Sequence, residues 1–431
     1  MRRFSIALVM CLICGTVLAQ QANRGKIKNV DLEKGLVTIT TVDGKDVEGV
    51  LTPQTIIHDA NNQTIADFRQ KGLPAGTNVM FRSEQRGDRL VLTGLKVPGA
   101  GDGQGKAGGQ AKAGGQKAAK SAATQANVPP PRDSIGAKPL TELGNETYKG
   151  ESGGLYGNGS NEPPASQQEA AKKAVARIQP LDAQGKPSPS GKIGFVGVGM
   201  SNTTMEFSAF KTMADKDPEK SAKVAVVDLA QGGQIPDKWN DPSSDVGTKV
   251  WNTVDQRLKA ADVSYEQVQV AWIKQALVQQ AQFGEFPAHA KKLENDLVTS
   301  LQLLKKRFPN LQLAYMSSRI YGGYATTPLN PEPYAYEGAF SIRWIIDRQV
   351  KGDPGLNADP ARGEVKSPVV LWGPYLWADG VTPRKDGLVW NIDDLRENDR
   401  THPGDSARRK VAEMLINFCH TDPYAKSWYS K

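Results

Sequence analysis

The chain has 431 residues, of which 39% are hydrophobic and 7% aromatic, and its formal net charge is +8. This length gives room for two or three domains of ordinary size. Lysine and arginine do not cluster with aromatic residues on any predicted folded element, so the charge does not indicate a nucleic-acid partner. A solvated linker, or loose attraction to acidic polymers or a cell surface, accounts for it better.

The first residues have the features of a secretory signal peptide. Arg2 and Arg3 precede an apolar run at 6–17, and short residues come before an expected cleavage after Ala19. We therefore expect a secreted or periplasmic protein, with a retained anchor as the alternative. The apolar run is too short for a stable span, and no later run is long enough, so no transmembrane segment is expected after cleavage.

Cysteine usage limits how the chain can be stabilised. Cys11 and Cys14 lie in the signal segment, so only Cys419 remains after cleavage. This excludes an intramolecular disulfide and a multi-cysteine metal site. Cys419 lies on the apolar side of the last predicted helix and is interpreted as a small core residue.

Residues 24–97 are predicted to form a small β-barrel with an accessory, binding or spacer role, for which a cell-envelope polymer is a candidate partner. Alternating polar and apolar stretches separated by turn sequences favour five or six short strands, with a helical turn at 65–70. His58 follows one strand without a second ligand at useful spacing, so it is interpreted as a turn residue. The expected strands are 26–30, 36–40, 50–52, 55–57, 79–81 and 90–92.

A linker and a lead-in follow the barrel. Residues 98–135 are rich in Gly, Ala, Lys, Gln and Pro and have almost no large apolar residue, which predicts a disordered tether. Residues 136–191 are predicted to be ordered loops with one helix at 166–178. Ser166 and Glu169 have the spacing of a capping box at the start of that helix.

From residue 192 to 421, short apolar strands alternate with helices. This pattern predicts a parallel sheet covered by helices on both faces. The expected strands are 193–198, 223–228, 268–273, 311–316 and 368–371. The expected helices are 204–213, 246–261, 288–308, 335–350 and 407–418.

Candidate catalytic residues follow the predicted strands or precede the last helix. Ser201 comes after the first strand, at the start of a helix where backbone N–H groups are free and the dipole is positive. Asp399 lies three residues before His402 and can hold its ring in one tautomer. Ser201 as a helix cap and 399–403 as a simple turn are the alternatives.

Candidate oxyanion donors follow the next two strands. Gly232 and Gly233 follow the second strand, and Gln275 follows the third. A glycine N–H, the Ser201 N–H and a side-chain amide can together surround a developing negative charge. A plain turn at the glycines and a hydrogen-bonded strand end at Gln275 are the alternatives.

Four sequence blocks carry a resemblance to a known family: Ser201, the glycine pair at 232–233, Gln275 and the Asp-x-x-His-Pro stretch at 399–403. Together they resemble the SGNH (GDSL-type) hydrolase superfamily over residues 192–421. The resemblance implies a flavodoxin-like three-layer α/β/α sandwich, separate from the all-β N-terminal domain. It implies hydrolysis of esters, often acetyl groups on polysaccharides or lipid and thioester substrates, with no metal or organic cofactor. Carried over by position, Ser201 is the nucleophile, His402 the base and Asp399 its orienter. The implied oxyanion hole is Ser201, Gly232 or Gly233, and Gln275.

The sequence departs from the family pattern in three blocks. Gly199-Met200-Ser201 stands where the family has Gly-Asp-Ser, and Ile273-Lys274-Gln275-Ala276 lies where it has Gly-x-Asn-Asp. The second block, at Gly232-Gly233, lacks an Asn, which leaves open which of the two glycines matters. Gln275 keeps a carboxamide but is one methylene longer. Lys274 is expected to be solvated or to supply a donor instead. A non-catalytic carbohydrate- or envelope-binding protein on the same scaffold is therefore the alternative function.

Two aromatic stretches, 319–324 and 372–377, are expected near the cleft. Aromatic platforms with an arginine suit sugar rings or an acidic polymer, and packing of the rim is the alternative. His289 and His420 lack partners at relay spacing and are interpreted as surface or structural residues.

From these motifs we expect an exported serine hydrolase that acts on carbohydrate O-acyl esters. The candidate substrate-binding residues are Asn202, Lys274, Arg319, Tyr321 and Trp377.

Overall fold

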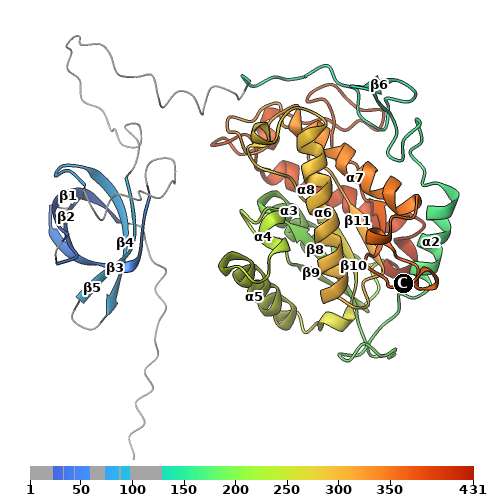
Figure 1. The fold of residues 1–431 in the computed structure, drawn as a ribbon, viewed down its shortest axis with the longest axis horizontal. Coiled ribbons are helices and arrows are strands. Elements are labelled where there is room, and N and C mark those ends of the chain that lie inside the picture. The colour runs from blue at the N-terminus through green and yellow to red at the C-terminus, as the bar shows by residue number, and fades with distance from the viewer. Residues whose placement is uncertain (1–22, 33, 43, 59–72, 87–88, 98–128) are drawn as a thin grey trace, which may run out of the picture. The chain divides into compact units, whose positions relative to one another are not determined.

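The computed structural model describes residues 23–32, 34–42, 44–58, 73–86, 89–97 and 129–431, in two compact units divided after Gln116 (Figure 1). The predicted signal peptide, the helical turn at 65–70 and most of the predicted linker lie outside the described residues. No helix in the described part of the chain is long and apolar enough to cross a membrane.

The first unit is a closed five-stranded barrel, as predicted, in the order β1-β2-β3-β5-β4. The two strands expected at 50–52 and 55–57 form one long strand, with His58 as its last residue rather than in a turn. Its ladder with the neighbouring strand is interrupted between Leu51 and Ile56, where Pro53 has no backbone N–H to donate. The strands are β1 (Asn23–Asp31), β2 (Leu36–Thr41), β3 (Asp46–His58), β4 (Asn78–Arg86) and β5 (Arg89–Lys96). Apolar side chains of alternating positions fill the barrel: Ile27, Val37, Ile39, Val79, Phe81, Leu92 and Leu95.

The second unit contains a five-stranded parallel sheet in the order β12-β11-β10-β8-β9. Counted along the chain, this order is 2-1-3-4-5, which is the flavodoxin-like arrangement. The predicted fold class is therefore confirmed. The strands are β8 (Ile193–Gly199), β9 (Val224–Asp228), β10 (Val268–Lys274), β11 (Leu313–Met316) and β12 (Val369–Trp372).

Helices cover both faces of the sheet and give three layers (Figure 1). One group consists of α3 and α8, which pack against each other, and the other of α4, α5, α6 and α7. The helices are α3 (Ser201–Ala214), α4 (Pro236–Asn240), α5 (Asp245–Ala260), α6 (Ala288–Arg307), α7 (Tyr334–Val350), α8 (Asp405–Thr421) and α9 (Lys426–Tyr429). The single 3-10 turns are η1 (Tyr265–Gln267), η2 (Gln280–Phe283), η3 (Pro354–Leu356), η4 (Pro360–Arg362) and η5 (Ile392–Asp394).

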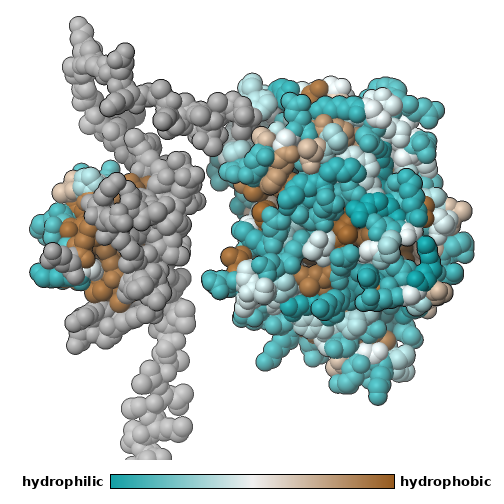
Figure 2. Space-filling view, in the orientation of Figure 1, coloured by the Kyte–Doolittle hydropathy of each residue, from teal (hydrophilic) through white to brown (hydrophobic). Residues whose placement is uncertain are grey.

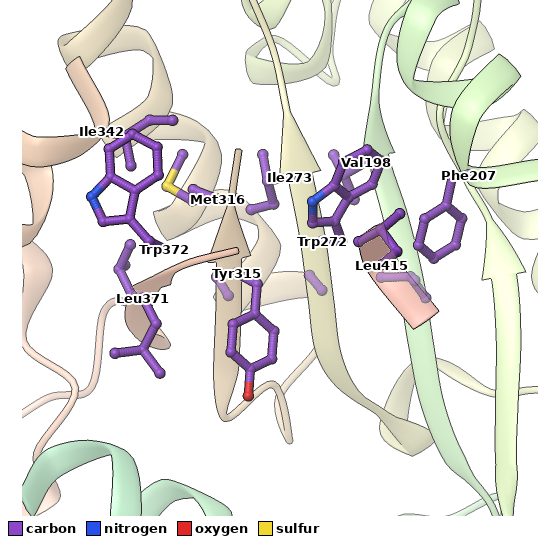
Figure 3. Close-up of a cluster of buried hydrophobic side chains, with 14 of the residues drawn as sticks. Val198, Phe207, Trp272, Ile273, Tyr315, Met316, Ile342, Leu371, Trp372 and Leu415 are labelled. Atoms are coloured by element: carbon purple, nitrogen blue, oxygen red, sulfur yellow. The ribbon is translucent and has the colours of Figure 1, made fainter. Parts of the chain in front are cut away.

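The core lies between the sheet and these helix layers (Figure 3). Trp272 and Tyr315 are paired across β10 and β11. The Trp272 ring stacks on Phe207 of α3 at 5.6 Å between centroids, and Tyr315 meets Phe418 of α8 edge-on at 5.0 Å. Nearly every strand residue is buried because both faces are covered. The face of the second unit seen in Figure 2 is mainly hydrophilic, with hydrophobic residues in small separate groups.

The lead-in differs from the prediction at its helix. That helix, α2 (Ala165–Val175), begins one residue before Ser166 and has Pro164 at its cap position without a side-chain cap bond. Ser166 therefore lies inside the first turn, so the predicted capping box is wrong. A short hairpin, β6 (Thr147–Tyr148) with β7 (Glu151–Ser152), precedes the helix.

The last residues of the predicted linker are held by the second unit. Asp379 accepts hydrogen bonds from the Ser134 hydroxyl at 2.5 Å and from the Ile135 N–H at 2.7 Å. The Arg132 N–H donates to the Gly323 carbonyl at 2.9 Å. A disordered linker reaching residue 135 is therefore wrong at this end, because a buried carboxylate and a loop carbonyl bind the chain there.

Candidate active site

Ser201 is the first residue of α3, directly after β8. The cap position before it is Met200, whose backbone is extended. The interpretation of Ser201 as a helix cap is therefore wrong, and its hydroxyl is free for other contacts. Gly199 allows the close approach of helix and sheet here, since a Cβ at this residue would lie 2.3 Å from the Lys274 carbonyl oxygen and 2.4 Å from Thr203 Oγ1.

Three predicted residues meet at this point. Ser201 Oγ lies 2.8 Å from His402 Nε2, and His402 Nδ1 lies 2.6 Å from Asp399 Oδ2. The carboxylate accepts the Nδ1 proton, which leaves Nε2 as an acceptor for the serine hydroxyl. The His402 side chain is 18% exposed, so the pair is reachable from solvent. The arrangement is that of a nucleophile, a base and an orienting acid.

The loop that carries Asp399 and His402 is tightly folded. Asp399 Oδ1 accepts the backbone N–H groups of Thr401 and His402, each at 2.9 Å. Arg400 between them has a left-handed backbone, with φ +47°. Burial alone raises the pKa of Asp399, but the hydrogen bonds from His402 and Thr401 outweigh it and hold that pKa below its usual value. Asp399 is therefore a carboxylate at neutral pH.

Gly232 is the glycine that lies beside Ser201. A Cβ at Gly232 would come within 3.9 Å of Ser201 Cβ, whereas one at Gly233 would meet nothing within 4 Å. Gly233 has φ +73°, so it serves the turn. The Gly232 and Ser201 N–H groups have no acceptor among the described residues. Both can donate to a developing oxyanion.

The turn before these glycines is held by hydrogen bonds from Arg257 and Gln231. The Arg257 guanidinium donates to the carbonyls of Asp228 and Ala230 at 2.9 and 2.7 Å. The Gln231 N–H donates to the Gly199 carbonyl at 3.0 Å, and its side-chain amide to the Val250 carbonyl at 3.0 Å. These bonds fix the position of Gly232 relative to the end of β8.

Gln275 is nearly buried, and one of its amide hydrogens is used by the protein. Its Nε2 donates to the Gln234 carbonyl at 3.3 Å, while its Oε1 has no partner among the described residues. The other amide hydrogen has no acceptor in the described part of the chain. A role for Gln275 in an oxyanion hole therefore stays a prediction.

Lys274 is buried, so the expectation of a solvated lysine is wrong. Its ammonium is paired with the Glu206 carboxylate of α3, and both side chains are within 1% of full burial. Burial lowers the pKa of Lys274 to about 8, with Glu206 opposing the shift and Arg319 adding to it. The pair connects α3 to β10, and neither side chain is exposed to solvent.

The other four predicted substrate-binding residues are also buried. Asn202 Nδ2 and Arg319 Nη2 both donate to the Thr401 carbonyl, at 2.9 and 3.3 Å. The Trp377 indole N–H donates to Glu332 at 2.7 Å, and the Tyr321 hydroxyl to the Arg132 carbonyl at 2.8 Å. The predicted exposed aromatic platform is therefore wrong. The rings pack inside the domain, as the alternative interpretation has it.

His289 and His420 have structural partners. His289 Nε2 lies 2.7 Å from Glu337, and His420 Nε2 lies 2.8 Å from Asp217. Both carboxylates come from distant parts of the chain, which is why sequence spacing did not reveal them.

Cys419 is buried, as predicted, and burial raises the pKa of its thiol well above the usual value. No group of three or more potential ligand residues in the described ranges is arranged to hold a metal ion.

Comparison with known proteins gives matches in structure only. No protein-family model matches the chain, and no curated protein matches it in sequence. One similar structure is a candidate SGNH hydrolase from Slackia heliotrinireducens, at 14% identity over 53% of this chain and 99% of that chain, with a TM-score of 0.28. Another is the lipase Lip_vut3 from a goat rumen metagenome, at 12% identity over 55% and 100%, with a TM-score of 0.31.

The α/β unit is similar to SGNH hydrolases and lipases. The N-terminal unit is similar to apo-CusF from Escherichia coli, at 21% identity over 20% of this chain and 98% of that chain, with a TM-score of 0.15. Since these identities are low, we infer function from the contacts of Ser201, His402 and Asp399.

Proposed function

We propose that this chain is an SGNH-type ester hydrolase with Ser201 as its nucleophile. The observation that carries the proposal is the continuous hydrogen-bonded line from Ser201 Oγ through the His402 ring to Asp399, at 2.8 and 2.6 Å. The backbone N–H groups of Ser201 and Gly232 have no acceptor among the described residues, and Gly232 lies beside Ser201. If Ser201 were only a helix cap and 399–403 only a turn, these two segments, about two hundred residues apart in the sequence, would not need to be in contact.

The reaction follows from the roles of these atoms. Ser201 Oγ attacks the acyl carbonyl while His402 Nε2 takes its proton, and Asp399 stabilises the resulting imidazolium. His402 then gives the proton to the leaving alkoxide as the ester bond breaks, which leaves an acyl-enzyme on Ser201. A water molecule attacks the acyl carbon, His402 takes its proton, and the proton returns to Ser201 as the acid is released.

The negative charge of each tetrahedral intermediate needs donors that are already in place. The first N–H groups of α3 have no acceptor within the helix, and the positive end of its dipole lies at Ser201. The Gly232 N–H adds a second donor from a turn anchored by Arg257. Removing one such donor from a hydrolase costs about 3–4 kcal/mol in the transition state.

We propose a carbohydrate O-acyl ester as substrate and export from the cytoplasm as the setting. The signal-peptide sequence and the resemblance to the superfamily support this choice. The buried aromatic rings give it no further support, so esters of other alcohols serve as the comparison. Rates on acetylated polysaccharide, p-nitrophenyl acetate and a long-chain p-nitrophenyl ester, measured side by side, identify the substrate class. The mass of the mature N-terminus tests cleavage after Ala19.

Substitution of the nucleophile tests the proposal. Hydrolysis of p-nitrophenyl acetate is measured for the wild type, for Ser201→Ala and for Ser208→Ala. Ser208 is a matched control because it is an exposed serine on the same helix, bonded to Asp228 at 2.8 Å. We expect the rate to be lost only in Ser201→Ala. A wild-type rate that survives in Ser201→Ala contradicts the assignment.

A non-catalytic binding protein on the same scaffold is the second candidate. The engagement of the Gln275 amide with the Gln234 carbonyl favours it, because that leaves the oxyanion site with two certain donors rather than three. The two candidates differ in a simple way. Retained binding of an acetylated glycan with no hydrolysis of any acyl ester identifies the binding protein.

A further inference from the structure

A small cavity lies behind the candidate site, between the segment after β10, the segment after β11 and helices α6 and α7. Its volume is about 10 Å³. Five of its lining residues each have a buried polar atom without a partner among the described residues. These atoms are Ser318 Oγ, Arg319 Nε, Gln275 Oε1, Gln280 Oε1 and Asn330 Oδ1.

The chemistry of these atoms identifies what would satisfy them. Arg319 Nε–H donates, the three amide oxygens accept, and the Ser318 hydroxyl can do either. All five residues are at most 6% exposed, so bulk solvent does not serve them. Unpaired polar groups at such depth are costly. A cation here would lie against the Arg319 guanidinium, and an anion would face three carbonyl oxygens. Water, with two donors and two acceptors, fits both kinds of partner.

The size of the cavity agrees with this chemistry. A space of about 10–15 Å³, measured with a water-sized probe, is what one water molecule needs, together with two to four polar partners. We propose that one water molecule binds in this cavity, accepts from Arg319 Nε and donates to two of the three amide oxygens, those of Gln275, Gln280 and Asn330. The same Arg319 is then a positioning residue for the acid and base of the site.

Arg319 reaches the base loop with the other end of its guanidinium. Nη2 donates to the Thr401 carbonyl at 3.3 Å, and Asn202 Nδ2 donates to the same oxygen at 2.9 Å. Thr401 lies between Asp399 and His402, and its N–H is bonded to Asp399. Thus the residue after the nucleophile and an arginine fixed by the cavity both hold the segment that carries the relay.

Three carboxyl groups act electrostatically on the Arg319 guanidinium. Burial lowers the pKa of its guanidinium, while Glu206, Glu332 and Asp399 oppose that shift. A neutral side chain of similar length would satisfy neither the water nor Thr401. We expect the segment to move in its absence, and a misplacement of about 1 Å costs about 100-fold in rate.

A high-resolution crystal structure tests the water site without reference to activity. The expected result is an ordered water within about 2.7–3.2 Å of Arg319 Nε and of at least two of the three amide oxygens. The Asn330→Leu variant should lack that water. An ion at this position, or side chains that close the space by bonding to one another, overturns the proposal.

The positioning role rests on the proposed hydrolase function and is tested by Arg319→Met. We expect kcat for p-nitrophenyl acetate to fall roughly 10- to 100-fold with KM nearly unchanged. The downfield proton resonance of the His402 Nδ1–H should shift or broaden. Arg319→Lys, which keeps the charge but not the fork, should recover only part of the rate.

Arg343→Met is the matched control. Arg343 is 5% exposed and is paired with Glu151, away from the relay. It should lower Tm as Arg319→Met does and leave kcat and the His402 resonance unchanged. Equal effects of the two variants on kcat and on the resonance contradict a positioning role. A wild type without esterase activity contradicts the hydrolase proposal instead. The crystal structure and the His402 resonance then still test the water site and the positioning role of Arg319.

Discussion

Replacing Asp399 with asparagine disturbs the relay at one atom. In the wild type, Oδ2 accepts from His402 Nδ1 at 2.6 Å, and Oδ1 accepts two backbone N–H groups at 2.9 Å. Asparagine keeps an oxygen for the backbone donors and turns an NH₂ group toward Nδ1. His402 must then carry its proton on Nε2, which faces Ser201 and can no longer accept the hydroxyl proton.

The loss should be large. The same reversal of tautomer in a Ser-His-Asp protease lowers kcat about 10⁴-fold, or about 5 kcal/mol of transition-state stabilisation. We expect a fall of that order for Asp399→Asn in the hydrolysis of p-nitrophenyl acetate, with KM changed little. The two backbone bonds to Oδ1 should keep the loop folded, so circular dichroism and Tm should stay near those of the wild type.

Asp394→Asn controls for removing a neighbouring buried acid. The Asp394 side chain is bonded to Ser406 and Lys410, each at 2.6 Å, and has no hydrogen bond to His402 in the described part of the chain. It should lower Tm and leave kcat nearly unchanged. A fall of less than about tenfold for Asp399→Asn, or equal falls for the two variants, would refute the relay.

Three further predictions concern the glycine turn, the buried Lys274–Glu206 pair and the buried Glu332 carboxyl group. Gly232→Ala should lower kcat by about tenfold or more, because its Cβ enters the space beside Ser201, whereas Gly233→Ala should cost about 1 kcal/mol of stability and little rate, measured by kinetics and urea unfolding. Lys274→Met should destabilise the domain by about 3–5 kcal/mol by leaving the Glu206 charge buried alone, and the double variant with Glu206→Leu should recover most of it; failure of that recovery would contradict the pair. Burial raises the pKa of Glu332 to about 7, so the folded state binds this proton more tightly than the unfolded chain, and stability should fall on the order of 3 kcal/mol as pH rises from about 4.5 to 7. The fall should be much smaller in Glu332→Gln, and an identical pH dependence would show that another group causes it.

Much of the fold followed from local patterns in the sequence. Apolar runs such as 193–198 and 268–273, separated by amphipathic helices, predicted the parallel sheet, and its strand order agrees with the flavodoxin-like arrangement. The contacts of Ser201, His402 and Asp399 were predictable because each residue lies beside an element end, where strand direction brings the side chains together. Errors at element ends were mostly of one to four residues, as at α8, since terminal turns have weak signals.

The surroundings of the site were not predictable from the same patterns. Lys274, Arg319 and Trp377 follow strands and are polar or aromatic, which is also what exposed binding residues look like. Their actual partners, Glu206, the Thr401 carbonyl and Glu332, come from segments far along the chain. Spacing carries no information about such pairings. The choice between Gly232 and Gly233 likewise depended on which of them meets Ser201 in space.

The most direct measurement is mass spectrometry of the protein quenched with acid during turnover of p-nitrophenyl acetate. The proposed mechanism predicts one acetyl group on the peptide that contains Ser201, present in the wild type and absent in His402→Ala. Acetylation at another residue, or steady hydrolysis by Ser201→Ala, would contradict the account.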